Sequence, residues 1–299
     1  MQESSNHAAM VGQLTEQVER HWQEWSRTLE PELLAKLQER PDFIPELKRV
    51  WEGSDYVIQS CIRVPGLLAG LLEAGDLHTV YPEGDMVRRL GLELEGASDE
   101  EALQRGLRCF RRIQMVRIIW RDLAGTAPLA ETLEDLSALA DACVDQALGL
   151  LYDWAVARHG VPKDEDGVQQ RMLVLGMGKL GARELNLSSD IDLIFAYPAM
   201  GEVEGGRYLS NEQFFTRLGQ QLIKAIGTQT VDGFVFRVDT RLRPFGDAGP
   251  LAMSFDAMEA YYHSQAREWE RYAMIKARIV AGEGEAVEEL SAMLRPFVY

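Results

Sequence analysis

The strongest constraint on the fold lies in residues 171–197, where two short apolar runs flank a glycine-rich turn. The first run, RMLVLG, ends in a glycine, and the second, IDLIFAY, begins at Ile191. Short apolar runs bounded by glycine and polar residues are typical of buried β-strands. We therefore predict strands at 171–176 and 191–197, joined by a tight connection.

The turn between these strands, Gly176-Met177-Gly178-Lys179-Leu180-Gly181, matches the G-x-G-x-x-G pattern of dinucleotide-binding folds. Those folds place a crossover of at least a dozen residues before the next parallel strand, and here only about ten residues follow the last glycine. A phosphate-binding Walker A loop is excluded as well, because Lys179 does not follow the last glycine and precedes no Ser or Thr. Two interpretations remain. The turn needs glycine for steric reasons, or its glycines let the backbone approach a phosphate.

Two acids, Asp190 and Asp192, lie at the start of the second strand. Residues two apart in a strand point to the same face, so the two carboxylates are predicted to project together. Neighbouring acids at a buried strand repel each other and lose hydration unless a cation compensates them. Their hard oxygen ligands suit Mg²⁺ or Mn²⁺, with phosphate oxygens completing the coordination shell. The alternative is that Ser188, Ser189 and Asp190 are turn residues and Asp192 is a cap.

A third strand is predicted at residues 233–242, GFVFRVDTRL, where apolar and polar residues alternate. Its polar face carries Asp239 together with three arginines, Arg237, Arg241 and Arg243. An acid flanked by arginines can be a metal ligand beside phosphate-binding cations, or part of a salt-bridged solvent face. Three carboxylates from two strands and a glycine turn predict a two-metal phosphoryl-transfer centre.

The rest of the chain has the three- and four-residue apolar spacing of helices. Such spacing occurs at 11–38, 54–73, 99–124, 130–159, 209–227 and from 254 onward. A polar stretch with Pro and Gly, 161–170, marks a boundary. We predict an α+β fold in three parts, which are a mainly helical region at 1–165, a central domain at 166–252 and a helical segment at 253–299.

The composition limits the class of protein. Apolar residues are 46% and charged residues 26% of the chain, the balance of a soluble globular protein. No apolar run is long enough to span a bilayer and the first residues are polar, so we predict a cytoplasmic location without membrane partners. The formal net charge of −16 argues against non-specific binding to nucleic acid. The three cysteines lack metal spacing and are predicted to be buried in a reducing compartment.

At the level of whole motifs, the glycine turn and the three acids resemble the polymerase β-type nucleotidyltransferase superfamily. Longer runs are similar to the family of glutamine synthetase adenylyltransferase/adenylyl-removing enzymes, and together they cover approximately residues 105–282. These runs are MVRIIWRDLAG, GMGKLGARELNLSSDIDLIFAY, RVDTRLRPFGDAGPLAMS and WERYAMIKARIVAG. The resemblance implies that 166–252 is a palm-like nucleotidyltransferase domain, between a large helical region and C-terminal helices.

In that family one long chain carries two homologous catalytic halves. The C-terminal half transfers AMP from ATP to a tyrosine of glutamine synthetase, and the N-terminal half removes it by phosphorolysis, giving ADP and tyrosine. The run Asn186-Leu187-Ser188-Ser189 resembles the N-terminal half, which implies adenylyl removal, a role in nitrogen metabolism, and glutamine synthetase, PII signal protein, inorganic phosphate and ADP/ATP as partners. The chain ends inside an expected helix at Tyr299, which indicates an excised fragment.

Two other functions remain open from the sequence. One is ATP-dependent adenylyl transfer, and the other is a non-catalytic module that binds nucleotide or PII. The presence of all three acids opposes the non-catalytic module, and the acidic net charge opposes a nucleic-acid polymerase.

The resemblance also assigns roles to residues. It implies that Asp190, Asp192 and Asp239 hold two Mg²⁺ or Mn²⁺ ions, and that Gly178 lets the backbone approach a phosphate. Lys179 stands where many superfamily members have serine, so contact with phosphate and exposure to solvent are equally open. The other candidates for phosphate or nucleotide binding are Ser189, Arg241 and Arg243.

Further charged residues are assigned supporting roles. Arg183 and Glu184 are predicted to form a local ion pair that shapes the turn. The arginines of the helix at 99–124 are expected to form mainly ion pairs with acids, and these are Arg108, Arg111, Arg112, Arg117 and Arg121.

Overall fold

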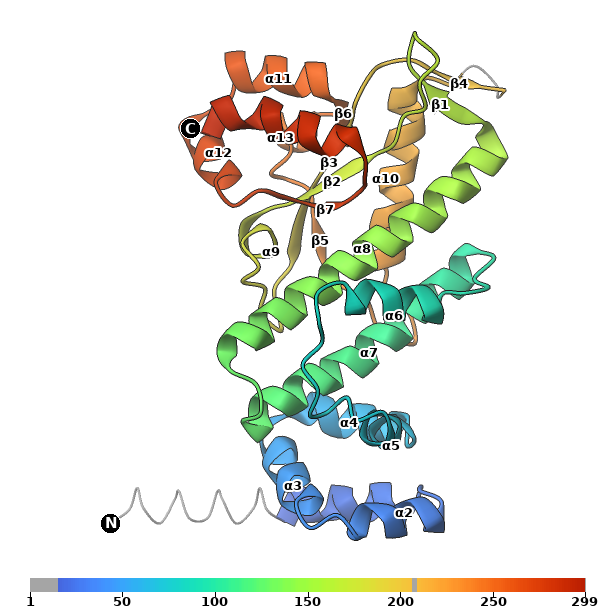
Figure 1. The fold of residues 1–299 in the computed structure, drawn as a ribbon, viewed down its shortest axis with the longest axis vertical. Helices are drawn as coiled ribbons and strands as arrows, with labels where there is room; N and C mark the ends of the chain where they lie inside the picture. The colour runs from blue at the N-terminus through green and yellow to red at the C-terminus, as the bar shows by residue number, and fades with distance from the viewer. Residues whose placement is uncertain (1–15, 206–208, 299) are drawn as a thin grey trace. The chain divides into compact units, whose positions relative to one another are not determined.

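The computed structural model describes residues 16–205 and 209–298, which form many helices and a small sheet (Figure 1). This arrangement confirms the predicted α+β class. The chain divides into two compact units, Met1–Pro82 with Arg111–Asp135, and Glu83–Phe110 with Leu136–Tyr299. The three-part division at residues 165 and 252 stays a prediction.

The described part of the first unit is helical. A helix at residues 16–26 is followed by α2 (Pro31–Gln38), α3 (Phe43–Gly53), α4 (Asp55–Arg63) and α5 (Leu67–Glu73). Trp25 and Trp51 are buried edge to face, with ring centroids 5.7 Å apart. The single helix predicted at 11–38 is wrong in its length. The chain turns after residue 26, and a new helix, α2, begins at Pro31. Residues 11–15 of that prediction lie outside the described residues.

Two long helices, α7 (Glu100–Ala124) and α8 (Leu129–His159), confirm the predictions at 99–124 and 130–159. Each contributes residues to both units. The acidic first turn of α7, Glu100 and Glu101, suits the positive end of its helix dipole. The short helix α6 (Asp85–Glu93) was not predicted.

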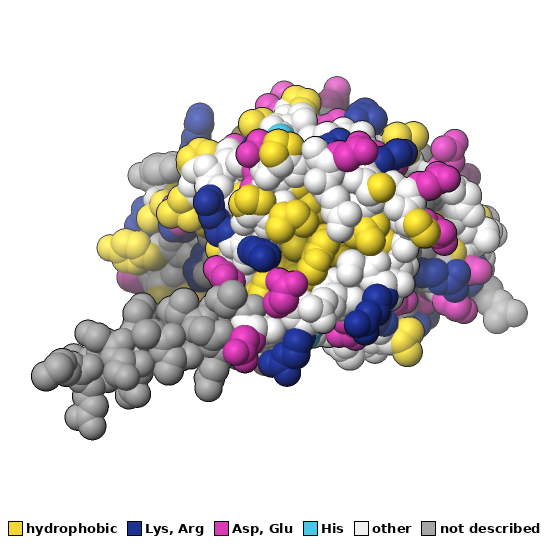
Figure 2. Space-filling model, turned by 90° about the horizontal axis from the view of Figure 1, so that it is seen from below, with side chains coloured by type: hydrophobic (Ala, Val, Ile, Leu, Met, Phe, Trp, Pro, Cys, Tyr) yellow, Lys and Arg dark blue, Asp and Glu magenta, His cyan; other side chains and the backbone are white. Residues whose placement is uncertain are grey.

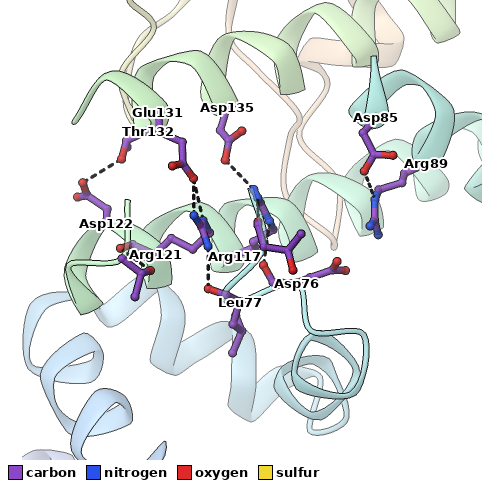
Figure 3. Close-up of polar contacts among 12 residues, drawn as sticks. Asp76, Leu77, Asp85, Arg89, Arg117, Arg121, Asp122, Glu131, Thr132 and Asp135 are labelled. Carbon is purple, nitrogen blue, oxygen red and sulfur yellow. Dashed lines mark hydrogen bonds and ion pairs between the residues drawn. The ribbon is translucent and has the colours of Figure 1, made fainter. Parts of the chain in front are cut away.

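The arginines of α7 anchor it in two different ways. In the first unit, Arg117 forms a buried ion pair with Asp135 of α8 at 2.6 Å, and Arg121 pairs with Glu131 (Figure 3). These pairs confirm the expectation of salt bridges. In the second unit, buried Arg108 donates instead to backbone carbonyls, those of Gln104, Ala225, Thr228 and Gly233.

The second unit contains the sheet, with strand order β5-β3-β2-β7 and β6 paired with β3. Its strands are β2 (Leu173–Gly176), β3 (Ile191–Tyr197), β5 (Val238–Asp239), β6 (Ala252–Ser254) and β7 (Arg278–Ala281). The strand β3 runs parallel to β5 and β6 and antiparallel to β2, which is antiparallel to β7. A separate pair joins β1 (Val161–Lys163) and β4 (Glu202–Glu204). The apolar runs thus confirm β2 and β3, whose bounds agree closely with the predicted ranges.

Helices cover both faces of this sheet (Figure 1). On one side lies α10 (Asn211–Gly227), whose Phe215 stacks on Tyr197 of β3 with centroids 4.8 Å apart. On the other side, Ile194 joins a core that includes residues of α11 (Phe255–Ser264), α12 (Glu268–Met274) and α13 (Glu285–Val298). A strand buried on both faces needs the near-continuous apolar sequence that β3 has.

Two predictions for this unit are wrong. The predicted strand 233–242 is reduced to Val238–Asp239, and it ends there because the Asp239 carboxylate accepts the backbone N–H of Arg241 at 2.8 Å and turns the chain. The region after residue 254 is not wholly helical, because it also contains β7, whose β-branched Ile279 and Val280 suit a strand.

Candidate functional site

The candidate acids meet at the end of β3. Asp192 of β3 lies directly opposite Asp239 of β5 across the parallel strand pair. Asp190 precedes β3 and is exposed, whereas Asp192 and Asp239 are partly buried. The parallel pairing of β3 with β5 thus brings Asp239 to Asp192 and Asp190, which lie far from it in the sequence.

The electrostatics of the three acids differ. The pKa of Asp192 is raised, first by burial and then by the negative charges of Asp239 and Asp190. The pKa of Asp239 is lowered, chiefly because Arg241 donates hydrogen bonds to its carboxylate. A cation beside Asp192 would therefore offset both the cost of its burial and the repulsion from its neighbours.

Two arginines engage the outer acids. Arg237 pairs with Asp190 and donates to the carbonyl of Ser188 at 2.7 Å. Arg241 pairs with Asp239, with Nε 2.8 Å from Oδ2. The sequence placed Arg237 on the face of the acids but assigned it no role. Arg237 lies two residues before Asp239, and this spacing was the signal that could have identified it as a partner of the acids.

Arg243 lies within the turn that follows β5 and away from the strand on which it was predicted. Its Nη1 donates to the carbonyl and hydroxyl of Thr240, at 2.8 and 2.9 Å, and lies 3.5 Å from Asp247. Its positive charge nevertheless helps to lower the pKa of Asp239. The prediction that Arg241 and Arg243 continue one strand face is therefore wrong. The positive charges of both residues still act on Asp239.

The glycine turn approaches the same acids. It forms the one-turn helix α9 (Gly178–Gly181), and the N–H of Met177 donates to the carbonyl of Asp192 at 2.9 Å. Gly178 has a φ of 55°, which favours glycine, and a Cβ built there would lie 3.5 Å from Oδ2 of Asp192. The backbone of this turn therefore comes close to a carboxylate of the site.

Lys179 and Ser189 are also brought together at the turn. The Lys179 ammonium donates to Oγ of Ser189 at 3.3 Å, and that hydroxyl donates to Oδ1 of Asn186 at 2.7 Å. Nearby, Glu184 pairs at 2.7 Å with Lys276, and the local pair between Arg183 and Glu184 stays a prediction. The charged group that Glu184 meets comes from a segment 92 residues further along the chain.

The chemistry of the three carboxylates fits a divalent cation, because all offer hard oxygen donors and Gly178 leaves space beside Asp192. Over residues 16–205 and 209–298, no three His, Cys, Asp or Glu side chains are already placed to hold a metal ion. Instead, Arg237 and Arg241 engage two of the acids, and these arginine side chains are 59% and 74% exposed. Long exposed side chains reorient at little cost, so they do not oppose binding of a cation strongly.

Comparison with known proteins identifies the relatives of the chain. Residues 44–293 match the family described as glutamate-ammonia ligase adenylyltransferase. Curated relatives are named bifunctional glutamine synthetase adenylyltransferase/adenylyl-removing enzyme. One from Thioalkalivibrio sulfidiphilus is 55% identical over 86% of this chain and 27% of the relative. One from Pseudomonas aeruginosa is 54% identical over 91% of this chain and 28% of the relative. One from Shewanella loihica is 44% identical over 99% of this chain and 31% of the relative.

The chain thus spans less than a third of the length of these relatives. Among the described residues, we find no helix with the length and apolar character needed to cross a membrane.

Proposed function

Since the chain belongs to the glutamate-ammonia ligase adenylyltransferase family, we propose that it is a nucleotidyltransferase that removes AMP from the adenylylated tyrosine of glutamine synthetase. The observation that carries the proposal is the pairing of Asp192 with Asp239 across β3 and β5, beside the backbone of Gly178. Acids at the edge of a sheet next to a close backbone turn suit the handling of a phosphate group by metal ions.

The metal ligands in this proposal are Asp190, Asp192 and Asp239. They would hold Mg²⁺ or Mn²⁺, as two ions. When bound, such ions polarise a phosphodiester and offset the negative charge that develops as it reacts. The raised pKa of Asp192 supports the proposal, because burial and then repulsion by Asp239 and Asp190 raise it, and the positive charge of a bound cation offsets both causes.

The other residues of the site would bind and orient phosphate groups. Arg241 is exposed and could turn from Asp239 toward a substrate phosphate, whereas Arg243 is held by Thr240 and would act mainly through its charge. Lys179 and Ser189 form a donor pair at the glycine turn, and Gly178 allows close backbone approach.

In the proposed reaction, an oxygen of inorganic phosphate attacks the phosphorus of the AMP group. The bond from that phosphorus to the tyrosine oxygen breaks, and the oxygen takes up a proton. The products are ADP and unmodified tyrosine. The role of the chain is to align the attacking and leaving oxygens and to stabilise the charge between them.

The direction of the reaction rests on resemblance, since the Asn186-to-Ser189 run is similar to the adenylyl-removing half of the family. The relatives are named for both activities, which favours ATP-dependent transfer to glutamine synthetase as the second candidate. PII signal protein as a regulator and a cytoplasmic location belong to the same proposal. A non-catalytic nucleotide- or PII-binding module is disfavoured because Asp190, Asp192 and Asp239 are all present.

The direct test is to incubate the chain with adenylylated glutamine synthetase, Mg²⁺ and inorganic phosphate, and to measure ADP. We expect Asp192→Asn to lower the rate by at least about 100-fold, the scale on which loss of a group that stabilises a transition state acts. A matched control is Asp256→Asn, which removes an exposed acid from the first turn of α11 and should leave the rate unchanged.

The same substitution in the full-length Thioalkalivibrio relative provides a second arm. ADP formation that survives the change in both proteins would show that these acids are not the site. Formation of adenylylated enzyme from ATP by this chain, with no ADP from the phosphorolysis assay, would instead establish the transfer reaction.

A further inference from the structure

Outside the candidate acids, Arg278 at the start of β7 makes an unusually complete set of contacts. Its guanidinium meets both carboxylate oxygens of Asp141 in α8, at 2.8 and 3.0 Å. The same group donates to the carbonyl of Leu180 at 3.0 Å and to that of Gly181 at 3.2 Å. One side chain therefore joins three elements of the second unit, which are α8, α9 and β7.

The two carbonyls lie at the C-terminal end of the glycine turn, α9. Helix ends leave carbonyls without partners inside the helix, and a positively charged donor is favourable there. The segment before β7 is also pressed against this point, because a Cβ on Gly181 would lie 1.7 Å from the carbonyl oxygen of Lys276. Position 181 has no space for a side chain that could bind these carbonyls locally, so the donor comes from Arg278.

The other end of α9 touches the candidate site. Met177, which caps the start of the helix, donates to the carbonyl of Asp192, and Gly178 lies beside the Asp192 carboxylate. A helix of one turn has little stability of its own, since its few hydrogen bonds scarcely offset the cost of ordering its residues. Its position must therefore come from contacts outside the helix.

We propose that Arg278 and Asp141 form a brace that positions the glycine turn against Asp192, which makes them positioning residues for phosphate binding in the reaction. This inference rests on the proposed function of the acids. It adds two residues that are not among the three acids and whose spacing in the sequence suggests no partnership.

The planar fork of arginine suits this role better than lysine. A guanidinium presents five donors in fixed directions and can face a carboxylate and two carbonyls at once, whereas an ammonium is a compact charge on a flexible stem. The pair is also sheltered, with side chains of Arg278 and Asp141 24% and 15% exposed. The neighbouring ion pair of Lys276 and Glu184 is 50% and 53% exposed, so it should hold the turn much less firmly.

The first test measures hydrogen exchange of the backbone amides that close α9. These are the N–H of Gly181, bonded to Met177, and the N–H of Ala182, bonded to Gly178. We expect Arg278→Lys to speed their exchange by about tenfold, because local opening becomes easier when a charge-assisted contact is lost. The control Lys276→Gln removes the exposed ion pair of Lys276 with Glu184 and should change the exchange rate of these two amides by less than about twofold.

The second test separates positioning from mere folding. A loosened turn weakens binding of phosphate equally in the ground and transition states, so Arg278→Lys should raise KM for inorganic phosphate about tenfold and change kcat less than about threefold. Asp141→Asn should give the same pattern. Because the pair acts as one unit, the double variant should be no worse than about the more affected single variant.

The outcomes distinguish the brace from the proposed function. Binding of Mn²⁺ to the unsubstituted chain, followed by electron paramagnetic resonance and lost in Asp192→Asn, tests the acids directly. Absence of both Mn²⁺ binding and ADP formation would overturn the proposed function and this positioning role together. An active parent whose exchange and KM are unchanged in Arg278→Lys, or whose kcat alone falls, would overturn the brace and leave the acids standing.

Discussion

Arg108 should be one of the most costly side chains to remove from the second unit. It is only 2% exposed, and its guanidinium donates to four backbone carbonyls, while Asp232 supplies a negative charge that acts on it. The accepting carbonyls come from α7, the end of α10 and the loop that leads to β5. The perturbation we consider is Arg108→Met, which keeps an unbranched apolar stem and removes every donor.

The magnitude follows from which carbonyls lose their partners. Gln104 lies one turn earlier in α7, and the Gly233 carbonyl also accepts the N–H of Thr230 at 3.0 Å. Among the described residues, the carbonyls of Ala225 and Thr228 receive no other hydrogen bond that would replace the guanidinium. A buried acceptor without a partner costs about 1–3 kcal/mol. Ala225 is buried whereas Thr228 is exposed, so the Ala225 carbonyl dominates and Arg108→Met should lower the free energy of unfolding by at least about 1–3 kcal/mol.

The assay is urea unfolding of the whole chain, combined with hydrogen exchange in the segment 222–240. Local exchange is needed because two compact units need not unfold together. The matched control is Arg105→Met, which removes an exposed arginine of the same helix paired with Glu101 and should cost less than about 0.5 kcal/mol. If Arg108→Met cost no more than the control, the carbonyls would not depend on the guanidinium and the reasoning would be refuted.

Three further changes test other contacts. Asp135→Asn leaves the fully buried Arg117 without its counter-charge and should lower the free energy of unfolding by about 3–5 kcal/mol in urea titrations; a cost below about 1 kcal/mol would contradict this. Gly181→Ala forces a Cβ against backbone and should destabilise the second unit by at least about 1–3 kcal/mol, whereas Gly70→Ala in α5 meets no atom within 4 Å and should be neutral or stabilising by the same measurement. Arg241→Gln removes a competitor for an acid of the site and should tighten Mn²⁺ binding in paramagnetic resonance titrations, while weaker binding would show that the arginine helps to assemble the site.

The best predicted parts of the fold are those whose structure follows from local sequence. The bounds of β3, Ile191–Tyr197, agree with the apolar run IDLIFAY because the strand is buried on both faces and polar residues precede it. The helices α7 and α8 are long, so their apolar spacing is repeated over many turns. In each case, nearest neighbours in the sequence carry the information.

Prediction failed where distant contacts or a single side chain decided the conformation. The alternation of residues 233–242 predicted a long strand, but one hydrogen bond from the Arg241 backbone to the Asp239 side chain ends it. The strand β7 begins shortly after α12, and it is paired with β2, which lies about a hundred residues earlier in the chain. The carbonyl acceptors of Arg108 in α10 and beyond are 117 or more residues away, and no periodic pattern reports a contact to backbone.

The candidate site shows the same division between local and distant information. The spacing of Asp190 and Asp192 indicated one cluster of charge, but only the parallel pairing of β3 with β5 places Asp239 opposite Asp192. That pairing also brings Arg237 to Asp190, whereas Arg241 reaches Asp239 from two residues away in the sequence. The ion pairs that the sequence left open as an alternative are therefore present at two of the acids.

This arrangement gives the two arginines a role that changes during the proposed reaction. A carboxylate oxygen cannot be fully engaged by a guanidinium and by a divalent cation at the same time, so binding of cations to Asp190 and Asp239 would release Arg237 and Arg241. Both side chains are exposed and anchored at the edge where a phosphate would bind, and a freed guanidinium has the geometry to grip phosphate oxygens in pairs. We expect the arginines that balance the charge of the acids to become phosphate ligands when the cations bind, which links assembly of the metal site to capture of the substrate.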